Sequence, residues 1–227
     1  WRCPLRRRRS PGHNTVMSER TIYVGAHVSA SGGVQNAVTN ALEIDASALA
    51  LFTRNQRRWT AKPYTDETIT AFHDAMKESG FTAEQVLPHA SYLINLGSPG
   101  DDVREKSVGG LTDELSRVVQ LGLKYLNFHP GTSKGEMDEE ATLRRIADGV
   151  DRVLASVDGG VLVLENTAGQ GSAMGEKIEQ LARIIEFAKE PDRLAVCIDT
   201  CHAFAAGYDI RSSEGWNNLV EEVERLV

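Results

Sequence analysis

Apolar runs alternate with amphipathic segments along most of this chain. Short apolar runs bounded by glycine, proline or polar residues predict strands, and longer segments with apolar positions three or four residues apart predict helices. The pattern predicts strands at 22–28, 48–52, 85–87, 125–128, 161–164 and 194–198. It predicts helices at 34–44 and 66–79, within 101–121, and at 138–157, 175–189 and 213–227.

The strict alternation of strands and helices predicts an α/β fold with a parallel sheet, either open and doubly wound or closed as a barrel. Six strand–helix units follow one another with no linker and no change in composition. A (β/α)8 barrel has eight such units, so six units that end within a helical pattern predict an incomplete barrel.

Four of the predicted strands end in a side chain of a type that binds metals. His89, His129, Glu165 and Asp199 follow apolar runs and lie 40, 36 and 34 residues apart by subtraction of their numbers. A parallel βα unit takes up roughly such a length. The carboxyl ends of parallel strands meet at one edge, where the chemistry of barrels and open α/β folds takes place. These residues therefore predict a divalent-metal site.

Each candidate taken alone also has a plain structural interpretation. A loop histidine is usually polar surface, and Glu165 could pair with a nearby lysine or arginine. Asp199 could cap a helix beside a surface His202. His27, at the end of the first strand, could belong to the site or could hydrogen-bond to one of its ligands.

Two histidines and a glutamate are a known catalytic zinc set with an open position for water. Asp199 could serve a second ion, with the two oxygens of Glu165 bridging the pair. Two close metal ions suit an in-line displacement at phosphorus, which makes phosphodiester hydrolysis plausible. A sugar isomerase could use the same constellation, so the chemistry of these residues leaves both activities open.

The loop after the second strand is basic and rich in amides. Residues 52–59 include Arg54, Asn55, Gln56 and Arg57 and end in Trp59. Arginine binds phosphate, amides reach base edges or sugar, and an aromatic ring can stack on a base. This loop therefore favours a nucleic-acid substrate.

The loop after the third strand is apolar where a loop is expected to be polar. It begins with Tyr92 and Leu93 and continues to Leu96. Exposed apolar side chains near a site could wedge into a stack of bases. The alternative is a short helix that packs on the barrel.

Composition narrows the kinds of partner and the cellular setting that this chain can have. The net charge of −7 argues against indiscriminate nucleic-acid binding, but a bound cation can reverse the field at a site. No apolar run approaches the roughly 18 residues needed to span a membrane. Three cysteines predict no disulfide framework, which favours a reduced, cytoplasmic setting. A zinc knuckle of Cys197, Cys201 and His202 is a further alternative.

The start of the chain is irregular. Residues 1–16 contain four consecutive arginines and precede the first methionine, Met17. We interpret them as a non-native or disordered leader before a single domain at 17–227, although an arginine-rich leader could also be a targeting peptide or a nucleic-acid arm.

Together, these motifs closely resemble the endonuclease IV family of zinc-dependent apurinic/apyrimidinic endonucleases. The resemblance extends from about residue 23 to the end of the chain. The motifs that carry it, in order, are GAHVS at 25–29, FTRNQR at 52–57, LPHASYLINL at 87–96, NFHPG at 127–131, ENTAGQG at 165–171 and CIDTCHAFAAGYD at 197–209. The last two are long and specific.

The resemblance implies a TIM barrel that holds three zinc ions and repairs double-stranded DNA by base excision. Such an enzyme cuts the phosphodiester 5′ to abasic sites and clears blocked 3′ ends, and a metal-held hydroxide rather than a side chain is its nucleophile. His89, His129 and Glu165 would bind the first zinc, with Glu165 bridging to the second. Asp199 would bind the second zinc and His202 the third.

The same resemblance places Asn55, Arg57, Tyr92 and Leu93 at the DNA, with the last three penetrating it at the lesion, and leaves His27 as a neighbour of the ligands. A histidine, an Asp-x-His pair and a glutamate of the family pattern are absent from these 227 residues. The second and third zinc sites are therefore expected to be partial, and the chain is expected to be an inactive, monomeric fragment. A metal-dependent sugar isomerase and a metal-stabilised DNA-binding remnant are the alternatives.

Overall fold

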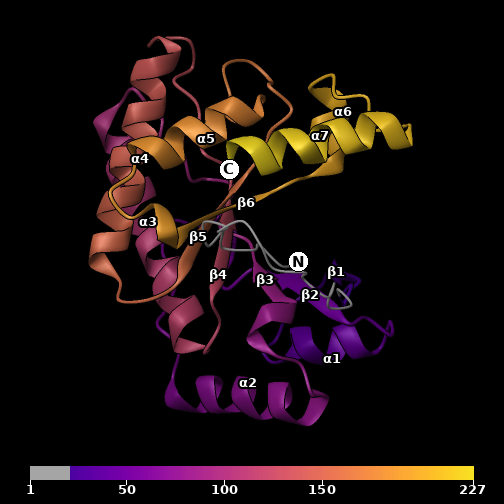
Figure 1. The fold of residues 1–227 in the computed structure, drawn as a ribbon. Helices are drawn as coiled ribbons and strands as arrows, with labels where there is room; N and C mark the ends of the chain where they lie inside the picture. The colour runs from indigo at the N-terminus through magenta and orange to yellow at the C-terminus, as the bar shows by residue number, and fades with distance from the viewer. Residues whose placement is uncertain (1–20) are drawn as a thin grey trace, which may run out of the picture.

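The computed structural model describes residues 21–227, so the predicted leader at 1–16 and Met17 lie outside the described residues. Six parallel strands alternate with helices (Figure 1). The strands are β1 (Gly25–His27), β2 (Ala48–Leu51), β3 (Val86–Pro88), β4 (Tyr125–Phe128), β5 (Val161–Glu165) and β6 (Leu194–Cys197). The helices are α1 (Asn36–Leu42), α2 (Asp66–Ser79), α3 (Asp101–Gln120), α4 (Glu139–Ser156), α5 (Ile178–Phe187), α6 (Thr200–Ala205) and α7 (Ser213–Leu226), with short 3-10 turns at Ala83–Gln85 and Pro191–Arg193.

The strands follow sequence order across two three-stranded parallel sheets, β1-β2-β3 and β4-β5-β6. A parallel bridge between His89 and Asn127 joins β3 to β4, so the two sheets form one curved layer. Within 21–227, β1 and β6 each have a strand on one side only. This arrangement is six consecutive strands of a parallel barrel, as the alternation of elements predicted.

The main core lies between the strands and the helices that surround them (Figure 1). Because side chains alternate along a strand, Leu162 and Leu164 of β5 face this core. Val163 lies on the opposite, inner face, where it packs with Ala195 and Cys197. Glu165 shares the orientation of Val163, so the residue that ends β5 faces the inside of the curved layer.

Local signals fix most helix boundaries. The Thr65 side chain accepts a hydrogen bond from the backbone of Thr68 at the start of α2, and Gly80 ends that helix with φ 74°. Asp138 caps α4 through the backbone N–H of Ala141 at 2.7 Å. These pairings satisfy N–H groups that the first turn of a helix leaves free. Because the sequence contains these capping residues, the predicted boundaries of both helices were close to the observed ones.

Two predictions of local structure were wrong. The sequence pattern did not predict α6, because its six residues are too few to show a helical period. The first strand was predicted too long, since pairing with β2 begins only at Gly25. No helix within 21–227 is both long and apolar enough to cross a membrane.

Candidate metal centre

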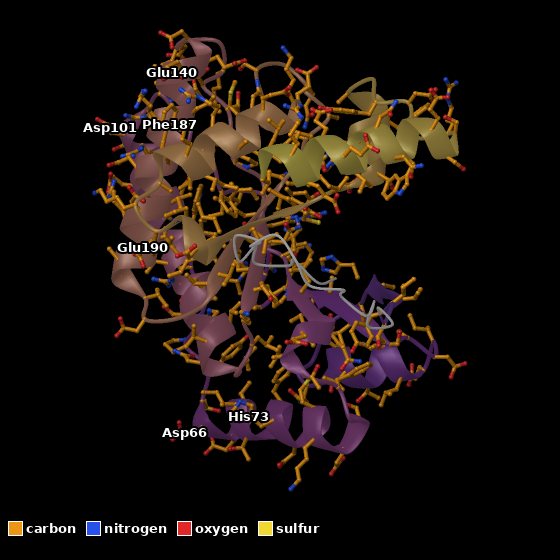
Figure 2. The ribbon with its side chains drawn as sticks, in the orientation of Figure 1. Asp66, His73, Asp101, Glu140, Phe187 and Glu190 are labelled. Atoms are coloured by element: carbon orange, nitrogen blue, oxygen red, sulfur yellow. The ribbon has the colours of Figure 1, made fainter. Side chains whose placement is uncertain are left out.

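Four of the five histidines in the described residues gather at the carboxyl ends of the strands. Neighbouring ring centroids are 6.4 Å apart for His27 and His89, 5.2 Å for His89 and His129, and 5.4 Å for His129 and His202. The fifth, His73, lies on α2 in the outer layer (Figure 2). The cluster lines a cavity of about 630 Å³ on the inner face of the strands.

Glu165 lies at the centre of the histidines and is buried, with 5% of its surface exposed. Its Oε2 lies 3.2 Å from Nε2 of His89, and its Oε1 lies 3.3 Å from Nε2 of His129. Nδ1 of His202 lies 3.3 Å from the same Oε1. Within 21–227 no lysine or arginine pairs with Glu165. The alternative of an ordinary salt bridge to such a residue is therefore wrong.

The charges of this cluster are coupled. Burial by itself would raise the pKa of Glu165, but hydrogen bonds from His129 and His89 and their charges outweigh burial and hold that pKa well below its usual range. Burial lowers the pKa of His89, yet Glu165 and the Ala90 carbonyl more than offset this, and the pKa of His89 is raised. The carboxylate is thus ionised and depends on positive charge beside it.

Asp199 and His202 make structural hydrogen bonds at the start of α6 and are also candidate metal ligands. Oδ1 of Asp199 accepts the backbone N–H of His202 at 2.8 Å and caps α6, as the plain interpretation suggested. Its other oxygen, Oδ2, lies 3.8 Å from Nδ1 of His202. Nδ1 of His202 also lies 2.9 Å from the Asn166 carbonyl oxygen. His202 is only partly exposed, so the suggestion of a free surface histidine was wrong.

Two groups of three residues each have ligand atoms within 4.8 Å of one another. One group is His89, His129 and Glu165, and the other is Glu165, Asp199 and His202. The five predicted ligands therefore come together with Glu165 shared, as the resemblance implied. His202 joins Glu165 and Asp199 in this geometry, whereas its assignment to a third ion stays a prediction.

The cysteines do not take part in either group. Cys197 is buried and Cys201 is exposed. Burial, together with the negative charges of Glu165 and Asp199, raises the pKa of the Cys197 thiol to about 12. Cys197 packs with Val163 and Ala195 and belongs to neither group of candidate ligands, which argues against the zinc knuckle.

Sequence reasoning missed two asparagines of the centre. Asn127 is buried within β4, and its side-chain amide donates to Oε2 of Glu165. Asn166 accepts the backbone N–H of Asp199 at 2.6 Å through its side chain. A polar residue inside an apolar strand was the available signal for Asn127. Both hold a candidate ligand in place, as hydrogen-bonding groups around metal ligands commonly do.

His27 is an exposed neighbour of the centre. Its ring centroid lies 4.4 Å from that of Phe52. Burial and the nearby charge of His89 lower the pKa of His27, partly offset by Glu165. No hydrogen bond of His27 to a candidate ligand occurs in the described part of the chain. Its predicted role beside the ligands therefore stays a prediction.

The side chains that the sequence offered for contact with DNA differ in their exposure to solvent. Asn55, Arg57 and Tyr92 are exposed, and Leu93 is half-buried. Arg54, offered by the sequence as a phosphate-binding side chain, is instead buried against Glu114. Residues 91–96 form turns rather than a helix, although Ile94 and Leu96 do pack into the core.

Comparisons with known proteins agree with this architecture. Residues 38–226 match the family model of the xylose isomerase-like TIM barrel. A probable endonuclease 4 of Campylobacter curvus (strain 525.92) is 49% identical over 205 residues, which cover 90% of this chain and 72% of that protein. Endonuclease IV from Thermus thermophilus superposes with a TM-score of 0.76 at 34% identity, covering 89% of this chain and 72% of that chain.

The fold and these matches place the chain among the xylose isomerase-like TIM barrels. A D-psicose 3-epimerase also superposes, with a TM-score of 0.67 over 89% of this chain and 71% of that chain, but at 12% identity it shows only the shared fold. The chain belongs to the endonuclease IV family, because the identity to a relative of which it covers more than two thirds is far higher.

Proposed function

We propose that this protein is a zinc-dependent endonuclease that repairs double-stranded DNA at abasic sites and blocked 3′ ends. One observation carries the proposal. A buried carboxylate, Glu165, is surrounded by His89, His129 and His202 and by the amide of Asn127, with no lysine or arginine of 21–227 to neutralise it. Such a donor set fits a divalent cation better than it fits a stabilising ion pair.

The donor chemistry favours zinc. Imidazole nitrogens and carboxylate oxygens are its usual ligands, and His89, His129 and Glu165 would hold one ion. Nδ1 of His89 lies 2.6 Å from the Ala90 carbonyl oxygen, which fixes the ring and leaves Nε2 as the nitrogen that faces Glu165. Asp199 and His202, with Glu165 shared, would hold a second.

Zinc bound there would activate water for attack on a phosphodiester and would neutralise charge that develops on its oxygens. The chain itself would position the DNA. Arg57 is free to approach a phosphate, and the exposed Tyr92 ring lies 5.3 Å from the ring of His89, centroid to centroid. An aromatic ring so close to the candidate ligands could stack in place of a missing base.

The sugar-isomerase alternative shares the fold and the type of ligand. A sugar isomerase would have no use for Arg57 and Asn55, which are exposed on the loop after β2. The family membership also favours the nuclease, because the epimerases resemble this chain in fold alone. A DNA-binding remnant that retains zinc would share the recognition surface and differ only in cleavage.

The experiment compares the affinity of the zinc-loaded chain for a duplex with one abasic analogue and for the same duplex intact. Selective binding that is lost on chelation is the expected result, and Glu165→Gln should lose it as well. Equal affinity for the two duplexes, or turnover of a sugar, would contradict the proposal. Nicking of the abasic duplex, measured in the same samples, reports on cleavage separately from binding.

A further inference from the structure

A second buried carboxylate lies outside the metal centre. Glu114 belongs to α3, and its Oε1 lies 2.8 Å from Nη2 of Arg54, which follows β2. Both side chains are 1% exposed. The two residues are 60 positions apart in sequence, so the pair ties the loop after β2 to a helix of the outer layer.

Arg54 also holds its own loop in shape. Its Nη1 donates to the carbonyl oxygens of Arg58 at 2.8 Å and Trp59 at 2.9 Å. These bonds draw the far end of the loop back toward its start. Asn55 and Arg57 lie on the segment enclosed between them and are exposed to solvent.

Glu114 connects the same pair to the loop after β3. Its two oxygens accept the backbone N–H of Ser91 at 3.0 and 3.2 Å. The Ser91 hydroxyl donates to the carbonyl oxygen of Gln56 at 2.7 Å and accepts the N–H of Leu93 at 3.2 Å. The hydrogen bonds therefore close a ring that runs from one loop through α3 to the other loop and back.

We infer that Arg54, Glu114 and Ser91 are positioning residues that hold the loop after β2 and the loop after β3 at a fixed spacing for damaged DNA. The inference rests on the proposed function. The ring ties together the two loops that carry the exposed Arg57 and Tyr92, the two side chains best placed to reach the DNA. Loops that are already ordered lose less conformational entropy on binding, which strengthens affinity without adding a contact.

The ring of Arg54, Glu114 and Ser91 shares no hydrogen bond with Glu165 of the candidate metal centre within the described residues. The side-chain partners of Glu165 there are histidines and Asn127. Breaking the ring should therefore change the loops and the affinity for DNA while zinc binding stays the same.

The test uses Ser91→Ala in the full chain with zinc bound. Ser107→Ala is the matched control, because the Ser107 hydroxyl of α3 accepts the backbone N–H of Asn95 in the loop after β3 at 2.9 Å without touching the loop after β2. Brief trypsin digestion reports on the loop after β2, where Arg57 and Arg58 are exposed. Cleavage at the exposed Arg211 is the internal reference.

Ser91→Ala should speed cleavage after Arg57 and Arg58 about fivefold relative to Arg211, the size expected for losing the one hydrogen bond by which the Ser91 hydroxyl holds the loop after β2. Its affinity for the abasic duplex should fall about as much, while zinc affinity is unchanged. Ser107→Ala should change neither. Cleavage of Ser91→Ala no faster than that of Ser107→Ala, or wild-type affinity for the abasic duplex, would overturn the inference.

The two proposals can fail separately. If the wild-type chain does not prefer the abasic duplex, the proposed function fails and the positioning role for DNA fails with it. If the wild-type chain does prefer it and Ser91→Ala binds equally well, only the positioning role fails. Digestion decides in either case whether the ring orders the loop.

Discussion

Glu114 and Glu165 are two buried carboxylates in different regions of one molecule, with exposed fractions of 1% and 5%. Glu114 lies between α3 and the loops after β2 and β3, and a guanidinium neutralises it. Glu165 lies at the carboxyl end of β5, and its polar side-chain partners among residues 21–227 are histidines and an amide. The difference between their partners, rather than burial itself, separates a structural ion pair from a candidate metal centre.

The two kinds of partner have different consequences. Arginine keeps its charge at any ordinary pH, so the cation beside Glu114 is always present, although burial raises the pKa of the Glu114 carboxyl. Histidine is charged only when protonated, and it binds metal only when neutral. When no metal is bound, protonated histidines therefore stabilise the buried glutamate. A metal ion can take the place of those protons, because the histidines that bind it are neutral.

The largest expected effect breaks the structural pair. Glu114→Leu should lower the free energy of unfolding by about 3 kcal/mol, because it leaves the buried Arg54 guanidinium with only the partly exposed Asp113, whose Oδ2 lies 3.5 Å from Nε. Denaturant unfolding of the zinc-free protein measures this loss. Zinc affinity should not change.

The double variant Arg54→Leu/Glu114→Leu provides the control. Most of the lost stability should return, because a buried ion pair can often be replaced by apolar residues at little cost. Loss of zinc affinity in Glu114→Leu would mean that the two regions are not separate as described. No recovery in the double variant would mean that the unpaired guanidinium is not the source of the lost stability.

A smaller effect distinguishes the two arginines of the loop after β2. Arg57→Ala should weaken binding to the abasic duplex about tenfold at low salt and reduce the salt dependence, as expected for one phosphate contact. Stability should be unaffected because Arg57 is exposed. Arg211→Ala removes an equally exposed arginine outside the site and should bind like wild type in the same anisotropy titration.

The sequence predicted which side chains come together in the candidate metal centre better than it predicted the surroundings of the loop residues. Glu165 could be predicted because an aliphatic strand of alternating faces ends in it, and strand periodicity places it with Val163 on one face. Arg54 and Arg57 lie in one short basic segment that composition could not divide, and only the family resemblance singled out Arg57 for contact with DNA. Only the position of α3, which brings Glu114 to Arg54 from 60 residues away, decides which of them is buried.

The alternation of strands and helices likewise predicted the parallel layer, because local residues mark the ends of each strand and each helix in the sequence. It could not predict Asn127 and Asn166 as partners of Glu165 and Asp199, because these contacts depend on the register between neighbouring strands. For residues 91–96 the sequence left open a loop with exposed apolar side chains and a short helix packed on the barrel. The structure has turns, with Tyr92 exposed and Ile94 and Leu96 packed into the core.

The smallest expected effect concerns the cysteines near Glu165. In a Cys3→Ser background, a thiol reagent at pH 8 should modify Cys201, which is exposed, and leave Cys197 unreacted. Burial raises the pKa of the Cys197 thiol to about 12, so almost none of it is thiolate at that pH. The count of modified thiols should be the same with and without zinc. Protection of Cys201 by zinc would support the zinc knuckle instead.

Zinc titration of the wild-type chain beside Glu165→Gln and Glu114→Gln tests whether Glu165 in particular makes the metal centre. Wild type and Glu114→Gln should bind zinc tightly, and Glu165→Gln should lose tight binding, because Glu165 is shared by both candidate groups. Zinc binding by Glu165→Gln as tight as that of the wild type would show that Glu165 is not the shared ligand.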